Sequence, residues 1–129
     1  MMNVEEAVFK NVGEAGVGVI IRDSQGHVVA AQSKKIHFPL GAIEAKALAM
    51  ESGILFALDL GMAEVILESD SWNVVKAVRR ESFPPSSISG VISGIQRRIP
   101  GFRIFETSHV KRKGNVPSHL LAQHAKSLK

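Results

Sequence analysis

The first third of the chain places short β-branched apolar runs between turn residues, a pattern typical of antiparallel strands. Residues 16–22 are rich in Val and Ile, residues 23–26 (Asp-Ser-Gln-Gly) favour a turn, and residues 27–32 resume an apolar run. A further strand is expected over residues 4–9, although Glu5 and Glu6 have poor strand propensity. The pattern therefore predicts three successive antiparallel strands.

After Gly41 the spacing of apolar residues changes, and strands and helices alternate. Residues 42–60 are rich in Ala, Leu, Met and Glu, and Gly61 is a natural end for that helix. The later elements are expected to be a strand over 64–68, a helix over 71–80, a helix over 88–99, a strand over 102–109 and a helix over 117–128. A meander followed by alternating strands and helices predicts a mixed α/β sheet with helices on both faces.

Length and composition fit one domain over residues 1–129. A chain of 129 residues can bury a core without disulfides, and it contains no cysteine. No apolar run approaches the ~20 residues of a membrane helix, and residues 1–6 lack the features of a signal peptide. We therefore expect an intracellular protein of the cytoplasm or nucleus that is not bound to a membrane.

Charge is divided unevenly between the two parts of the chain. Residues 1–70 carry five Lys/Arg and ten Asp/Glu, whereas residues 71–129 carry eleven and two. Such an asymmetry favours a polyanionic partner, because clustered cations displace counterions from phosphates. The alternative is a solvated basic surface with no partner.

Three acidic residues are candidates for a metal site. Asp70 follows an expected strand, where α/β sheets gather ligands, although it could instead cap the next helix. Glu44 lies in the first turn of the long helix, on one face with Leu48, Leu55 and Leu58, and could merely favour the helix dipole. Glu5 would meet both if its strand were central, and otherwise would be exposed near the terminus. Carboxylates held together need cations, and hard oxygen ligands suit Mg²⁺ or Mn²⁺.

Four spaced blocks of sequence resemble one family. They are GVGVIIRD at 16–23, EAKALA at 44–49, ESDS followed by two valines at 68–75, and HVKR with Asn115 and SHLLA at 109–122. Together they resemble the ribonuclease-H-like domains abundant in plants, which are reverse-transcriptase-like and related to retroelements. The resemblance implies the ribonuclease H fold, with a five-stranded mixed sheet whose strands 1–3 are antiparallel, and an acidic cluster that binds two Mg²⁺ or Mn²⁺ ions.

The family's site residues transfer onto this chain with two changes. Glu44 and Asp70 match its helix glutamate and strand-end aspartate, whereas Glu5 stands where the family has aspartate, and its extra methylene moves the carboxylate. His119 stands where many ribonucleases H have a fourth acid, and it could shuttle protons or be a plain polar residue near a helix start. The loop before the last helix lacks a glycine- and histidine-rich segment, and residues 39–43 lack polar groups for reading the hybrid's minor groove.

The densest basic cluster is a candidate phosphate anchor. Lys111, Arg112 and Lys113 stand next to Asn115, and a solvated loop is the alternative. Trp72 could stack on a base, but we expect it to pack in the core with Val75 and Val78.

The leading hypothesis is a monomeric, metal-dependent endonuclease of ribonuclease H type that hydrolyses the RNA strand of RNA–DNA hybrids. Asp70, Glu44 and Glu5 would hold the metal and His119 would assist the reaction. A nucleic-acid-binding module that lost turnover through the changes at Glu5 and His119 is the alternative. A protein-interaction domain is a third reading, which intact Glu44 and Asp70 disfavour.

Overall fold

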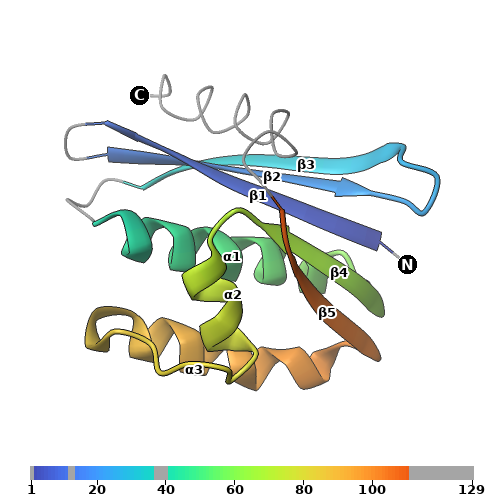
Figure 1. Ribbon diagram of the computed structural model, residues 1–129. Helices are drawn as coiled ribbons and strands as arrows, with labels where there is room; N and C mark the ends of the chain where they lie inside the picture. Colours follow the sequence, from blue (N-terminus) through green and yellow to red (C-terminus); the bar gives the residue numbers. More distant parts are fainter. Residues whose placement is uncertain (1, 12–13, 37–40, 111–129) are drawn as a thin grey trace.

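A computed structural model describes residues 2–11, 14–36 and 41–110. These residues form one five-stranded sheet with the order β3-β2-β1-β4-β5 (Figure 1). The strands are β1 (Met2–Asn11), β2 (Glu14–Arg22), β3 (Val28–Ile36), β4 (Glu64–Ser69) and β5 (Ile104–His109). The mixed sheet confirms the predicted fold class, and every strand expected from the sequence is present.

The central strand β1 joins two kinds of pairing. It is antiparallel to β2 along its whole length, and β2 is antiparallel to β3. On its other side β1 runs parallel to β4, but only over Met2–Glu5, and β4 runs parallel to β5. Glu5 is therefore the last residue of β1 that pairs with β4, at the point where the two strands separate.

The helices of the described region all lie on one side of the sheet (Figure 1). They are α1 (Ala42–Asp59), α2 (Trp72–Val78) and α3 (Ser89–Arg98), with short 3-10 turns at η1 (Ser86–Ile88) and η2 (Ile99–Gly101). Helix α1 covers β1, β2 and β4, and α3 packs on α1 and α2. The sequence predicted helices on both faces, and the helix expected over residues 117–128 lies outside the described residues.

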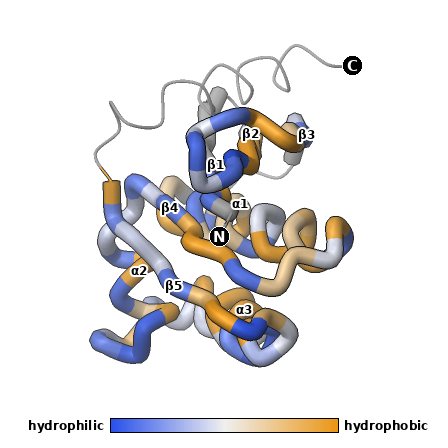
Figure 2. The backbone as a smooth tube through the Cα atoms, turned by 90° about the vertical axis from the view of Figure 1, so that its right-hand side faces the viewer, coloured by the Kyte–Doolittle hydropathy of each residue, from blue (hydrophilic) through white to orange (hydrophobic). Residues whose placement is uncertain are grey.

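The core fills the space between the sheet and α1. Apolar stretches of β2 and β4 (orange in Figure 2) supply buried Ile21 and Leu67, and α1 supplies Met50 and Ile54. Gly53 allows α1 to approach closely, because a Cβ there would lie 3.2 Å from the side chain of Val4.

The buried face of α1 differs from the leucine face that the sequence suggested. Leu55 is 36% exposed, and Leu48 and Leu58 are only partly buried. The residues buried are mostly small (Ala45, Ala47, Ala49, Met50, Gly53, Ile54 and Ala57). Small side chains bring the helix axis nearer to the sheet, so α1 turns its alanine face inward.

Two glycines end or reverse elements as the sequence predicts. Gly61 has φ +71° after α1, and Gly26 has φ +86° in the turn between β2 and β3. Within the part of the chain that the structure describes, no helix is long and apolar enough to cross a membrane.

Candidate nucleic-acid and metal site

Asp70 is a buried carboxylate between β4 and α2. The N-cap of α2 is Ser71, whose hydroxyl accepts a hydrogen bond from the backbone N–H of Val74 at 3.4 Å. The Asp70 side chain is only 8% exposed, and Lys46 Nζ of α1 donates to its Oδ1 at 2.9 Å. Ser71, and not Asp70, is therefore the cap of α2, and the Asp70 carboxylate pairs with Lys46 instead.

Glu5 is the second buried acid and lies on β1, the strand that pairs directly with β4. Its backbone faces Ile20 of β2 and Glu68 of β4. Arg22 Nε donates to Glu5 Oε1 at 3.0 Å, whereas Oε2 is buried without a hydrogen-bond partner among the described residues. A buried carboxylate oxygen without a partner is costly. This oxygen is therefore suited to receive a further cation or donor.

Glu68 adds to the negative charge beside Glu5. Burial raises the pKa of Glu68 above its usual value, and the charge of Glu5 raises it further, while Arg22 acts in the opposite direction. The ionised forms of Glu5 and Glu68 thus disfavour each other. A positive charge placed between these two strands would relieve that repulsion.

Glu44 lies in the first turn of α1, where its charge favours the helix dipole. Its carboxylate folds back over the start of the helix and lies so close to Gly41 that a Cβ at that position would collide with it. In residues 2–11, 14–36 and 41–110, no three His, Asp or Glu side chains lie close enough together to hold a metal ion. The shared role of Glu5, Glu44 and Asp70 therefore stays a prediction, and His119 lies outside the described residues.

These residues fit a hard divalent ion by the type of their donor atoms. Glu5, Glu44 and Asp70 offer only carboxylate oxygens, which Mg²⁺ and Mn²⁺ prefer, and Glu5 Oε2 has no other partner in the described region. Charge within the chain works against metal binding, because Lys46 and Arg22 already neutralise Asp70 and Glu5. A metal would have to share or replace these cations.

The indole of Trp72 is on the surface beside Asp70, so the expected core packing is wrong. The residue is 43% exposed, and its ring centroid lies 5.4 Å from that of His109. Lys76 Nζ lies 5.8 Å from the indole centroid, and the guanidinium carbon of Arg79 lies 5.9 Å from it. His109 Nε2 lies 3.2 Å from the backbone oxygen of Asp70. We call Trp72, Lys76, Arg79 and His109 the Trp72 patch.

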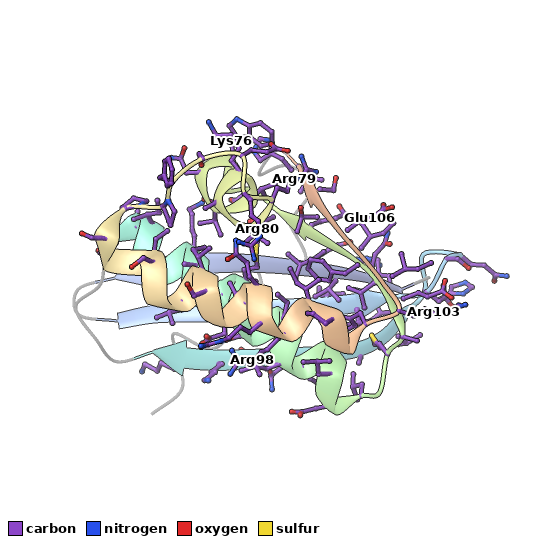
Figure 3. All side chains as sticks on the ribbon, turned by 90° about the horizontal axis from the view of Figure 1, so that it is seen from below. Lys76, Arg79, Arg80, Arg98, Arg103 and Glu106 are labelled. Atoms are coloured by element: carbon purple, nitrogen blue, oxygen red, sulfur yellow. The ribbon has the colours of Figure 1, made fainter. Side chains whose placement is uncertain are left out.

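Position along α2 explains why Trp72 is exposed while its neighbours are not. Val75 and Val78 are buried against the core, as predicted, but Trp72 begins the helix at the edge of the sheet, where β5 ends beside it. Figure 3 shows that Lys76, Arg79 and Arg80 come from the same helix and its end. An aromatic face with cations beside it suits a nucleobase and its phosphate.

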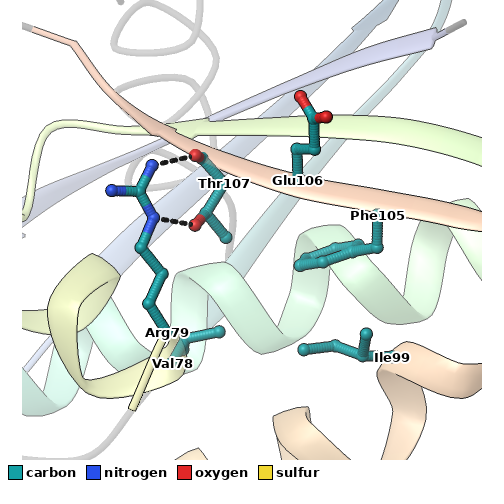
Figure 4. Close-up of a pocket in the computed structure, with 6 residues that line it drawn as sticks. All are labelled: Val78, Arg79, Ile99, Phe105, Glu106 and Thr107. Atoms are coloured by element: carbon teal, nitrogen blue, oxygen red, sulfur yellow. Dashed lines mark hydrogen bonds between the residues drawn. The ribbon is translucent and has the colours of Figure 1, made fainter. Parts of the chain in front are cut away.

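Arg79 is held in place by β5 and borders a separate hollow. Its Nε donates to Thr107 Oγ1 at 2.9 Å, and a second guanidinium nitrogen donates to the Thr107 backbone oxygen (Figure 4). The hollow measures about 370 Å³ and has an apolar floor of Val78, Ile99 and Phe105. Fixing Arg79 on β5 keeps a positive charge beside the indole.

Lys111, Arg112, Lys113 and Asn115 lie outside the described residues, which end one residue after β5 at Val110. They remain predicted phosphate contacts.

A family model described as reverse transcriptase-like matches residues 3–125. The chain belongs to the reverse transcriptase-like family. No curated protein matches this chain by sequence.

Solved structures share the fold of this reverse transcriptase-like domain. The ribonuclease H1 of the halophilic archaeon Halobacterium salinarum is 23% identical, with a TM-score of 0.86 over 97% of this chain and 95% of that one. LC11-RNase H1, solved in complex with an RNA/DNA hybrid, is 18% identical, with a TM-score of 0.86 over 97% and 96% of the two chains. The N-terminal ribonuclease H domain of a Mycobacterium tuberculosis protein is 20% identical, with a TM-score of 0.85 over 96% and 97%. The reverse transcriptase-like domain therefore has the ribonuclease H fold.

Several residues of this site were not singled out by sequence reasoning. Lys46 stands two positions after Glu44, a spacing that predicts a different helix face. Arg22 and Glu68 meet Glu5 only through strand register. The alternation of side chains along a strand would have placed Glu68 on the face opposite Val65 and Leu67, but apolar Ile66 on that same face hides the signal.

Proposed function

We propose that this domain is a metal-dependent endonuclease of ribonuclease H type that binds RNA–DNA hybrids and hydrolyses the RNA strand. The observation that carries the proposal is the position of Asp70. A buried carboxylate that caps no helix stands beside an exposed tryptophan flanked by cations. The family and the fold support the same activity, and LC11-RNase H1 has been solved with an RNA/DNA hybrid.

The acidic residues would hold the ions of the reaction. Asp70, Glu44 and Glu5 would ligate two Mg²⁺ or Mn²⁺ ions, which when bound supply an activated water and stabilise the leaving oxygen of the phosphodiester. Glu5 is the weakest of the three ligands, because Arg22 occupies its Oε1 and its side chain is one methylene longer than aspartate. His119 would assist proton transfer.

The Trp72 patch would position the nucleic acid. Its indole offers a face for one base, and Lys76 offers a charge for the adjacent phosphate. Lys111, Arg112, Lys113 and Asn115 would supply further contacts to phosphates. Residues 71–129 carry eleven basic and two acidic residues, and this excess of positive charge supports binding to the phosphates of a nucleic acid.

A nucleic-acid-binding module without turnover is the second candidate. It is favoured by two contacts, Lys46 with Asp70 and Arg22 with Glu5, which neutralise the acids without a metal. Such a protein would bind hybrids through the same Trp72 patch and leave them intact. Only a measurement of cleavage separates the two candidates.

The deciding experiment compares three proteins on one labelled RNA–DNA hybrid. We expect the wild-type chain to cleave weakly with Mg²⁺ and faster with Mn²⁺, which accepts imidazole ligands more readily. Glu5→Asp should raise the rate by up to about 100-fold, since an ångström of misplacement can cost that much. Asp70→Asn should abolish cleavage.

A matched control removes a charge elsewhere. Asp59 is an exposed acid at the end of α1, so Asp59→Asn should leave the rate unchanged. If the wild type and Glu5→Asp are both inert with either metal while hybrid binding persists, the binding module replaces the nuclease. If Asp70→Asn cuts as fast as the wild type, the cleavage site lies elsewhere.

A further inference from the structure

Lys46 places a positive charge against Asp70, which is one of the proposed metal ligands. Its Nζ lies 2.9 Å from Asp70 Oδ1. The Asp70 side chain is 8% exposed and that of Lys46 is 32% exposed, so the pair joins a buried acid to a lysine that reaches solvent. Glu44, the other predicted ligand on α1, stands two residues earlier and turns its carboxylate toward Gly41.

We infer that Lys46 is a built-in cation that competes with divalent metal for Asp70. The inference rests on the proposed function for the identity of the site, but it concerns metal loading rather than cleavage. A carboxylate oxygen that accepts a hydrogen bond from an ammonium group at 2.9 Å offers that lone pair to no metal. The ammonium would also repel a divalent ion bound on the other Asp70 oxygen, since both cations would stand within a few ångströms.

The competition is reversible because Lys46 can leave. A lysine side chain is a flexible four-carbon stem, and about a third of this one already faces solvent. Metal binding then requires Lys46 to move away from Asp70, which lowers metal affinity without abolishing it. Removing Lys46 should consequently take away one cation that a metal would otherwise have to displace from Asp70.

Arg22 repeats the arrangement on β1, with Nε 3.0 Å from Glu5 Oε1. There one carboxylate oxygen stays without a partner in the described region, so a metal could still bind Glu5 without displacing Arg22. Lys46 is therefore the residue whose removal should change metal affinity most.

The test measures Mn²⁺ binding directly, without nucleic acid, by the electron paramagnetic resonance signal of free Mn²⁺. We expect Lys46→Met to bind Mn²⁺ at least tenfold more tightly than the wild type. Lys46→Arg keeps the charge and should stay as weak as the wild type. Lys34→Met removes a charge from an exposed position on β3 and should stay within twofold of the wild type.

Thermal unfolding gives a second, independent measurement. Without metal, Lys46→Met should melt below the wild type, because the buried Asp70 carboxylate has lost its ion pair with Lys46. Saturating Mn²⁺ should restore the melting temperature of Lys46→Met. It would not do so if Lys46 stabilised the wild type only by packing against its neighbours. If Lys46→Met is too unstable to purify, Lys46→Gln, which keeps a neutral donor, takes its place with the same expectations.

Two outcomes overturn the inference. One is a folded Lys46→Met or Lys46→Gln protein with wild-type Mn²⁺ affinity, and the other is an equal gain in affinity for Lys34→Met. Neither result depends on whether the protein cleaves a hybrid. A tenfold gain in Mn²⁺ affinity would uphold the inference even if the nuclease proposal fails.

Discussion

Trp72 offers a direct measurement of nucleic-acid binding, because it is the one tryptophan in the sequence. Its intrinsic fluorescence therefore reports this residue alone. At 43% exposure the indole should emit as a partly solvated ring and should be open to a soluble quencher. If a base stacks on it, adding nucleic acid should quench the emission in a saturable way.

The magnitude follows from how much of the ring is free. Stacking of one base on an aromatic side chain contributes about 1–3 kcal/mol. His109 and the cations of the Trp72 patch already cover part of the indole, so we take the lower end of that range, about 1.4 kcal/mol. Trp72→Ala should therefore weaken binding about tenfold. The salt dependence should not change, because no charge is removed.

The assay combines quenching of the wild type with anisotropy of a labelled RNA–DNA hybrid for the variants. Phe83→Ala is the matched control, since Phe83 is 99% exposed on the loop beyond the opposite end of α2. Its affinity should equal that of the wild type. Wild-type emission that stays constant at saturating hybrid, or equal losses in Trp72→Ala and Phe83→Ala, would refute base stacking at Trp72.

Two further predictions concern charge. Burial and the charge of Glu5 raise the pKa of Glu68 in the folded protein. The protonated side chain therefore stabilises the fold below the ordinary pKa of 4.5, and this contribution to the free energy of unfolding is lost as pH rises through the raised pKa. Glu68→Gln should accordingly melt above the wild type at pH 7 and level with it near pH 4; an advantage that persists at pH 4 would point to another cause. Neutralising Lys111, Arg112 and Lys113 together should lower the slope of log affinity against log salt by about 2–3, and an unchanged slope would remove these residues from the phosphate contacts.

Local pattern determined the elements of the described residues and the mixed α/β sheet, while the ribonuclease H fold itself came from the family resemblance. The β-branched runs, the turn at 23–26 and the Ala-rich run closed by Gly61 depend on neighbours within a few residues. For that reason the three-stranded meander and α1 agree with their predictions to within a few residues. Asp70 and Glu44 were also singled out from position, one just past a strand and one in the first turn of a helix.

What only the tertiary structure decided was which residues meet, because contacts between elements depend on register and helix rotation. Periodicity predicted that Trp72 would follow Val75 and Val78 into the core, yet the end of the sheet leaves it exposed. The long helix turned its alanine face, not its leucines, to the sheet. Lys46 and Arg22 carry no local signal of a role, but packing of α1 on the sheet brings one to Asp70, and pairing of β2 with β1 brings the other to Glu5. In both ion pairs the cation that neutralises the buried acid comes from another element, and a linear sequence does not specify that meeting.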